Sequence, residues 1–163
     1  MRVLFVGINP GIRSAAIGHH FAGYSNRFWK LLYESALVPE PIGTEDDGRL
    51  PEWGFGITNL IARPSSGIDV LRPEEFVAGE RTLRRKVRRW RPSVVALVGV
   101  TLARALFERR SGEPVALGLQ PERYEGASVF VLPNPSGRNA NFSYRAMLAE
   151  YSALRRWLDR LSP

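Results

Sequence analysis

The stretch Ser93-Val94-Val95-Ala96-Leu97-Val98-Gly99 decides the fold class, because it is almost wholly apolar and ends at a glycine. A run without polar alternation is typical of a strand that is covered on both faces. Residues 127–132 form a similar run, and residues 2–8 and 56–61 are two further strand candidates. We therefore predict a central, mostly parallel sheet of four strands inside a three-layer α/β/α domain.

Helical periodicity fills the intervals between these strands. The clearest helix spans residues 73–90: it opens with a proline, which suits a first turn, and Phe76, Leu83 and Val87 lie at helical spacing. Further helices are predicted at residues 26–35, 102–109 and 143–161, and a loop at residues 39–51. No repeat or linker-like shift in composition interrupts the chain, so we predict one domain over residues 1–163.

Composition excludes several kinds of chemistry. The chain has no cysteine and its only histidines are His19 and His20, so disulfides are excluded and we expect no metal or other cofactor. No run reaches the roughly 18 apolar residues of a membrane span, and Pro10 cuts the first run too short for a secretory leader. We expect a soluble, monomeric, cytoplasmic protein of bacterial type. The net charge of +7 favours a polyanionic partner, although a compositional bias of the source genome would give the same excess of arginine.

Two turns built around Asn-Pro follow predicted strands. They are Gly7-Ile8-Asn9-Pro10-Gly11 and Asn134-Pro135-Ser136-Gly137. Ligands of parallel α/β sheets bind at the carboxyl ends of the strands, which allows the two turns to face one crevice. Glycine permits close approach of the backbone, Pro10 fixes the turn, and the Asn9 amide can hold a water or a base edge. The first turn alone also fits an ordinary strand-to-loop connection.

Together the two turns resemble the motif pair of the mismatch-specific uracil-DNA glycosylases, the Mug and thymine-DNA glycosylase branch of the uracil-DNA glycosylase superfamily. Phe21-Ala22, residues 26–30 and residues 56–64 also match in kind and order, so the resemblance covers nearly the whole chain. It implies a monofunctional enzyme that flips uracil, notably from G:U mispairs, out of double-stranded DNA. Such an enzyme hydrolyses the N-glycosidic bond and leaves an abasic site for base-excision repair.

The resemblance also implies roles for the first turn and the loop that follows it. Asn9 would position the attacking water, and Phe21 would stack on the flipped base. The base pocket would be completed by Ile8, Gly11, Ser14, Asn26 and Asn134. A core position is the alternative for Phe21, although it belongs to no periodic apolar face. His19 and His20 either contact a phosphate of the DNA or occupy loop positions without a functional role.

The second turn would enter the minor groove, with Arg138 filling the gap that the flipped nucleotide leaves. A guanidinium can stack on bases and also donate to the base that has lost its partner. The resemblance implies an aliphatic residue at this position in bacterial members, so an arginine here is more similar to the eukaryotic branch. The preference for the base opposite the uracil therefore stays open. The predicted DNA contacts are Arg13, Arg63, Ser136, Gly137, Arg138 and Asn139, with Arg27 beside them.

Other uracil-DNA glycosylases carry an aspartate in the first motif, where this chain has Asn9. An amide cannot act as a general base, and cleavage passes through an oxocarbenium-like cation that a carboxylate would stabilise. Asp69, in the loop after the second predicted strand, is the best-placed substitute. A local turn or cap ahead of Pro73 is its alternative role.

A basic run on the helix at residues 73–90 also has two interpretations, a DNA-binding surface or the solvated outside of a covering helix. The second is favoured, because covering helices usually point away from the strand-end crevice. The run consists of Arg81, Arg84, Arg85, Lys86, Arg88, Arg89 and Arg91.

Two other functions were weighed against the glycosylase. A catalytically weak or inactive nucleic-acid-binding module on the same fold is the main alternative, since the first motif lacks its aspartate. A small-molecule hydrolase is disfavoured, because the chain has no Gly-x-Ser-x-Gly elbow.

Overall fold

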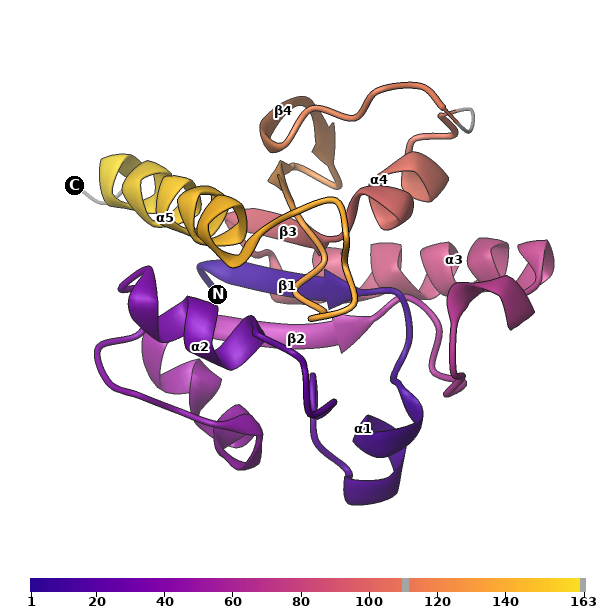
Figure 1. Cartoon of the computed structure of the whole chain (residues 1–163). Coiled ribbons are helices and arrows are strands. Elements are labelled where there is room, and N and C mark those ends of the chain that lie inside the picture. The colour runs from indigo at the N-terminus through magenta and orange to yellow at the C-terminus, as the bar shows by residue number, and fades with distance from the viewer. Residues whose placement is uncertain (110–111, 162–163) are drawn as a thin grey trace.

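The computed structural model describes residues 1–109 and 112–161, and its centre is a five-stranded sheet with helices on both faces (Figure 1). The strands are β1 (Val3–Gly7), β2 (Phe55–Asn59), β3 (Val94–Val98), β4 (Gly118–Tyr124) and β5 (Ala127–Leu132). Their order across the sheet is β2-β1-β3-β5-β4, and each pairing between described strands is parallel except that of β4 with β5. The predicted mostly parallel α/β/α fold is confirmed.

The predicted number of four strands is wrong, because β4 adds a fifth strand at the sheet edge. Burial alternates along β4, with Gln120 and Tyr124 buried. Its register with β5 shifts between Leu119 and Arg123, on either side of Pro121. Proline has no N–H for a ladder bond and is confined to edges and bulges. This strand therefore lacks the continuous apolar run by which the other four are recognised.

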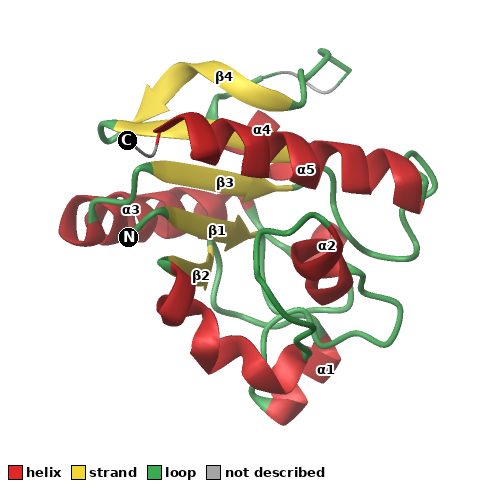
Figure 2. Ribbon diagram, turned by 90° about the vertical axis from the view of Figure 1, so that its left-hand side faces the viewer, coloured by secondary structure: helices red, strands yellow, loops and turns green. Residues whose placement is uncertain are grey.

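Helices cover both faces of the sheet (Figure 2). They are α1 (Ile12–Ile17), α2 (Phe28–Glu34), α3 (Pro73–Trp90), α4 (Val100–Leu106) and α5 (Tyr144–Leu161), with 3₁₀ helices η1 (Thr44–Trp53) and η2 (Ile68–Val70). One apolar core joins α2, η1 and α5 to the face that carries Phe5 and Phe55. The other core joins α3 and α4 to the face that carries Leu4 and Val6. Because β1 is buried on both faces, its sequence is apolar without alternation.

Four helices follow the prediction: α3 has the predicted bounds, and α2, α4 and α5 lie within three residues of theirs. Two elements are not predicted. The helix α1 buries none of its residues, so no apolar face marks it in the sequence. The 3₁₀ helix η1 occupies much of the segment predicted as a loop, and the Asp46 carboxylate caps it by accepting the N–H of Gly43 at 2.9 Å. No helix in the described part of the chain is long and apolar enough to cross a lipid bilayer.

Candidate active site

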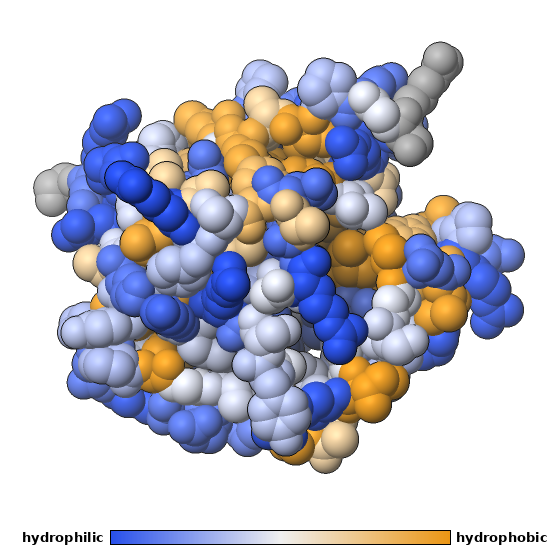
Figure 3. All heavy atoms as spheres, in the orientation of Figure 1, coloured by the Kyte–Doolittle hydropathy of each residue, from blue (hydrophilic) through white to orange (hydrophobic). Residues whose placement is uncertain are grey.

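A cleft with a volume of about 760 Å³ opens at the carboxyl ends of β1, β2 and β3, and both Asn-Pro turns line it. In the orientation of Figure 1 the second turn lies toward the viewer, and the surface there is largely hydrophilic (Figure 3). Six asparagines line the cleft: Asn9, Asn26, Asn59, Asn134, Asn139 and Asn141. Among the described residues that line it, none is an aspartate or a glutamate. A ligand there meets amides, hydroxyls, imidazoles and one guanidinium.

The first turn is fixed to the chain that follows β2. The carbonyl of Gly7 accepts the N–H of Leu60 at 2.8 Å, and the carbonyl of Pro10 accepts the N–H of Ser65 at 3.2 Å. These bonds continue the parallel pairing of β1 and β2 beyond the sheet, where Gly7 already pairs with Asn59. The backbone around Asn9 is therefore an extension of the sheet.

The Asn9 side chain has a fixed orientation. Its Nδ2 donates to the carbonyl of Arg63 at 2.9 Å and to Oγ of Ser65 at 2.7 Å, and that hydroxyl donates onward to the carbonyl of Gly67 at 2.8 Å. A backbone carbonyl can only accept, so the nitrogen of the amide must face Arg63. The Oδ1 of Asn9 has no recorded partner in the described part of the chain and is left as a hydrogen-bond acceptor in the cleft.

Phe21 lines the cleft and packs on Phe28, with ring centroids 4.1 Å apart and an interplanar angle of 27°. Its φ of 50° lies in the left-handed region, which costs energy for a bulky residue and therefore needs support from its surroundings. Ala22 supplies that support: its N–H donates to Oγ of Ser14 at 3.0 Å, and its carbonyl accepts Nε of Arg13 at 2.8 Å. One face of the Phe21 ring is covered by Phe28, which leaves the other for a ligand.

Asn26 and Ser14 present donors to the cleft. The Oδ1 of Asn26 accepts the N–H of Phe28 at 2.9 Å, so the remaining Nδ2 can only donate. The Oγ of Ser14 accepts from Ala22, which leaves its hydroxyl hydrogen to donate. Ile8 and Gly11 also line the cleft, and a Cβ added at Gly11 would meet nothing within 4 Å.

The second turn bonds mainly to itself. The Oδ1 of Asn134 accepts the N–H of Ser136 at 3.0 Å, and the carbonyl of Asn134 accepts Nδ2 of Asn139 at 3.0 Å. Asn134, Ser136, Arg138 and Asn139 line the cleft. Gly137 is not among the lining residues.

The second turn is held to the loop before α2. The N–H of Gly137 donates to the carbonyl of Ser25 at 2.8 Å, and the N–H of Arg27 donates to the carbonyl of Pro135 at 2.9 Å. A Cβ added at Gly137 would lie 2.7 Å from that same Ser25 carbonyl oxygen, closer than side chains approach backbone. The glycine is therefore required for this contact between loops.

The predicted DNA-contacting arginines Arg13, Arg63 and Arg138 are not equivalent. Arg63 lies outside the cleft lining and is paired with the Glu75 carboxylate, through Nε at 2.6 Å and Nη2 at 2.9 Å. This pairing lowers the pKa of Glu75 to about 2. Arg13, also outside the lining, bonds to the loop at Ala22. Arg138 is exposed at the cleft, and its guanidinium makes no recorded hydrogen bond or ion pair with a described residue.

Asp69 lies in η2, is exposed, and does not line the cleft, although its neighbours Gly67 and Ile68 do. No hydrogen bond of its carboxylate to a described residue is recorded, so the structure shows no capping bond for it. The cap of α3 is supplied by Glu75, whose Oε2 accepts the N–H of Arg72 at 2.8 Å. The geometry therefore does not favour a catalytic role for Asp69, whereas its place in η2 agrees with a position in a local turn ahead of Pro73.

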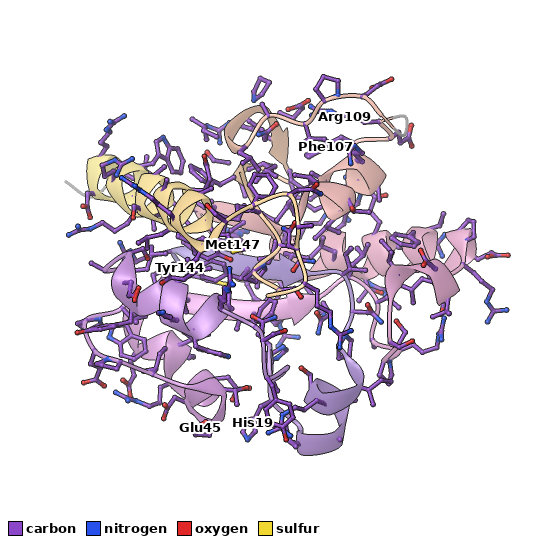
Figure 4. All side chains as sticks on the ribbon, viewed as in Figure 1. His19, Glu45, Phe107, Arg109, Tyr144 and Met147 are labelled. Atoms are coloured by element: carbon purple, nitrogen blue, oxygen red, sulfur yellow. The ribbon has the colours of Figure 1, made fainter. Side chains whose placement is uncertain are left out.

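Both histidines line the cleft, at the loop after α1. Burial lowers the pKa of His20, so its imidazole is neutral at pH 7. The Nδ1 of His19 lies 3.1 Å from Oδ1 of Asp47, and the N–H of His20 donates to Oδ2 of Asp47 at 2.9 Å. Figure 4 labels His19 on the same side of the molecule as Glu45 of η1. The unpredicted η1 thus holds one wall of the cleft.

Several residues that line the cleft were not predicted as site residues from the sequence, and Asn59 and Ser65 are two of them. Asn59 ends β2, and Ser65 is buried and bonds to Asn9. A polar residue at the end of a strand can indicate a site residue from the sequence alone, and Asn59 stands at such a position. Ser65 gives no such signal, because its position depends on how the loop folds back.

The basic residues of α3 lie away from the cleft, and no described residue of that helix lines it. Arg84 pairs with Glu80 at 2.7 Å and with Glu125 at 2.8 Å, and Arg88 also pairs with Glu125 at 2.8 Å. Arg84 and Arg88 are therefore balanced locally by acidic side chains, and the position of the run agrees with the outside of a covering helix.

Comparison with known proteins places the fold and its cleft in a family. A model of the uracil DNA glycosylase superfamily matches residues 1–158, and the chain belongs to this superfamily. Over 147 residues it is 42% identical to the G/U mismatch-specific uracil DNA glycosylase of Schizosaccharomyces pombe (strain 972 / ATCC 24843). That match covers 86% of this chain and 45% of the relative, so the chain spans slightly less than half of the relative's length.

Proposed function

We propose that this protein excises uracil from double-stranded DNA, with G:U mispairs as its main substrate, and leaves an abasic site for base-excision repair. The observation that carries the proposal is the meeting of both Asn-Pro turns at one cleft, with the Asn9 amide fixed by two hydrogen bonds. Membership of the superfamily and the activity for which the Schizosaccharomyces pombe relative is named support it.

The cleft suits a flipped pyrimidine. The free face of Phe21 offers a stacking surface, and the Nδ2 of Asn26 offers a donor for a base carbonyl. The Ser14 hydroxyl adds a second donor. A base inside the duplex cannot reach these groups, so binding requires that the nucleotide leave the stack.

Asn9 then acts on the attacking water. Its Oδ1 accepts a hydrogen bond from that water and orients it toward C1′ of the deoxyribose. The bond between C1′ and N1 breaks, N1 keeps the electron pair, and the water oxygen bonds to C1′ while its proton passes to solvent. Because the described residues of the cleft lining include no carboxylate, the rate depends on donors that stabilise the departing base rather than on a base that deprotonates the water.

Arg138 fits the role of a wedge in the DNA. It is exposed at the cleft and its guanidinium is unpaired within the described part of the chain, so it can enter the gap left by the flipped nucleotide. Arg63, paired with Glu75, is a weaker candidate for a DNA contact than the sequence indicated.

The test is an end-labelled duplex with one U:G pair, treated with alkali after incubation, beside matched U:A, T:G and single-stranded uracil substrates. We expect cleavage at uracil, fastest in the U:G duplex, and none in a C:G control. If none of the substrates shows an alkali-sensitive site, the proposed glycosylase activity is rejected.

The alternative is a binding module that has lost catalysis, and the lack of a carboxylate in the cleft lining is the observation that favours it. The same duplexes separate the two functions. A U:G duplex that is retained in a gel shift but yields no abasic site supports the binding module.

A further inference from the structure

Tyr24 is the most exposed large apolar side chain in the described part of the protein, with 90% of its surface accessible. It directly follows the lining residue Gly23 and is not itself part of the lining, so it lies beside the cleft. A tyrosine exposed at such a place has a large rigid surface and a polar tip, which is typical of residues that contact a partner. Neither the fold nor the proposed chemistry of the cleft requires this ring.

The ring is held in place by Arg13. The guanidinium carbon of Arg13 lies 3.9 Å from the ring centroid, and its Nη1 donates to the Tyr24 hydroxyl at 2.8 Å. The Nε of the same arginine bonds to the carbonyl of Ala22 at 2.8 Å, which ties the pair to the loop backbone. One face of the ring is thus covered by a cation, and the high exposure means that the opposite face is open.

The position of Tyr24 is set by the second Asn-Pro turn. Asn26 and Ser136 form an antiparallel bridge, and the bond from Gly137 to Ser25 continues it. Tyr24 and Ser25 lie in the turn that the N–H of Asn26 closes on the carbonyl of Gly23 at 2.9 Å. Tyr24 and Arg138 are both exposed, and each lies two residues from the bridge that joins the two loops.

We propose that Tyr24, supported by Arg13, stacks on the base that flanks the flipped nucleotide; this inference rests on the proposed function. When a nucleotide leaves the duplex, the faces of its neighbours lose their stacking partner. An open aromatic face on the loop that is bridged to the second turn can replace that partner, and it accepts any base because every base has a π face. The Arg13 cation behind the ring adds attraction for the polyanionic strand.

Kinetics of Tyr24→Ala give the first test. Because the ring touches a flanking base and not the reacting bond, we expect KM for a U:G duplex to rise about tenfold and kcat to stay within twofold. Tyr24→Phe keeps the ring and loses only the bond from Arg13, so it should stay within twofold of wild type in both constants. Tyr33→Ala, on α2 and 42% exposed outside the cleft lining, is the matched control. A Phe variant as weak as the Ala variant would reject stacking in favour of the hydroxyl bond.

Fluorescence gives a test that does not depend on excision. Two proteins are compared, the single variant Asn9→Ala and the double variant Asn9→Ala with Tyr24→Ala. Each is bound to a duplex that carries 2-aminopurine directly 5′ or directly 3′ of the uracil. Stacking on Tyr24 quenches the fluorescence of 2-aminopurine on one side of the uracil. In that duplex, the double variant should therefore give about twofold higher fluorescence in the bound state than the single variant. Equal signals from both proteins on both duplexes overturn the proposal. A wild-type protein that excises no uracil overturns the proposed function instead, whatever the probe reports.

Discussion

The two Asn-Pro turns line the same cleft but are built in different ways. The first continues the sheet, and the amide of Asn9 is tied to the chain after β2 by two hydrogen bonds. The side-chain amides of the second turn bond within the turn, and only its backbone is tied to the loop before α2. This turn carries the exposed Arg138, whose guanidinium has no hydrogen bond or ion pair in the described part of the chain. A rigid turn suits the placement of one small nucleophile, whereas an exposed turn suits contact with a large and variable partner.

The largest effect is expected from Asn9→Ala in the first turn. The variant loses the acceptor for the attacking water, and misplacement of a reacting group by about 1 Å costs roughly 100-fold in rate. We expect single-turnover excision from a U:G duplex to fall by about that factor while duplex affinity changes little. Excision at the wild-type rate would show that the first turn does not hold the water.

Arg138→Ala tests the second turn. Loss of a wedge that also donates to the widowed base should reduce kcat/KM for a U:G duplex by about tenfold. Single-stranded uracil has no gap to fill, so its excision should stay within twofold. An equal loss on both substrates would place Arg138 in the chemistry and remove the contrast between the turns.

Ser65→Ala tests whether the rigidity of the first turn matters. It removes one of the two acceptors of the Asn9 amide and leaves the carbonyl of Arg63. One hydrogen bond is worth about 1 kcal/mol, so we expect kcat to fall about fivefold. Ser66→Ala is the matched control, since that hydroxyl lines the same cleft without a recorded bond to any described residue. Equal rates for the two variants would mean that the amide is held well enough by the backbone alone.

The smallest effect is expected from Asp69→Asn. The carboxylate is exposed and outside the cleft lining, so removing its charge should leave kcat for a U:G duplex within twofold of wild type. A decrease of tenfold or more in the same single-turnover assay would show that the Asp69 carboxylate takes part in catalysis beside Asn9. The catalytic interpretation made from sequence would then be correct.

Much of the fold is predictable because the buried strands carry continuous apolar runs. β3 and β5 are recognised by composition alone, and α3 by the spacing of Leu83 and Val87. β4 is not, because an edge strand with Pro121 has one covered face and no such run. The same holds for α1, which packs nothing into the core.

The site is predictable where a motif ends a strand, and less so where loops fold back. Asn9 and Asn134 follow buried strands, so parallel topology alone brings them to one edge. The bond between Asn9 and Ser65, and the pairing of Arg63 with Glu75, depend on loop geometry that no periodicity encodes. The sequence therefore predicts which residue types meet at the cleft, but it does not predict which arginine is paired with a carboxylate and which is available to bind DNA.

The helix α1 has a consequence for the breadth of the substrate range. It buries no side chain and is fastened to the opposite loop through Ser14 and Arg13 at Ala22. An element without core contacts opens at low free energy, so its amides should exchange with deuterated water much faster than those of α5. The cleft thus has one stiff wall, at Asn9, and one compliant wall. Under the proposed function, we therefore expect that displacement of α1, and not of the turn at Asn9, makes room for a bulkier base.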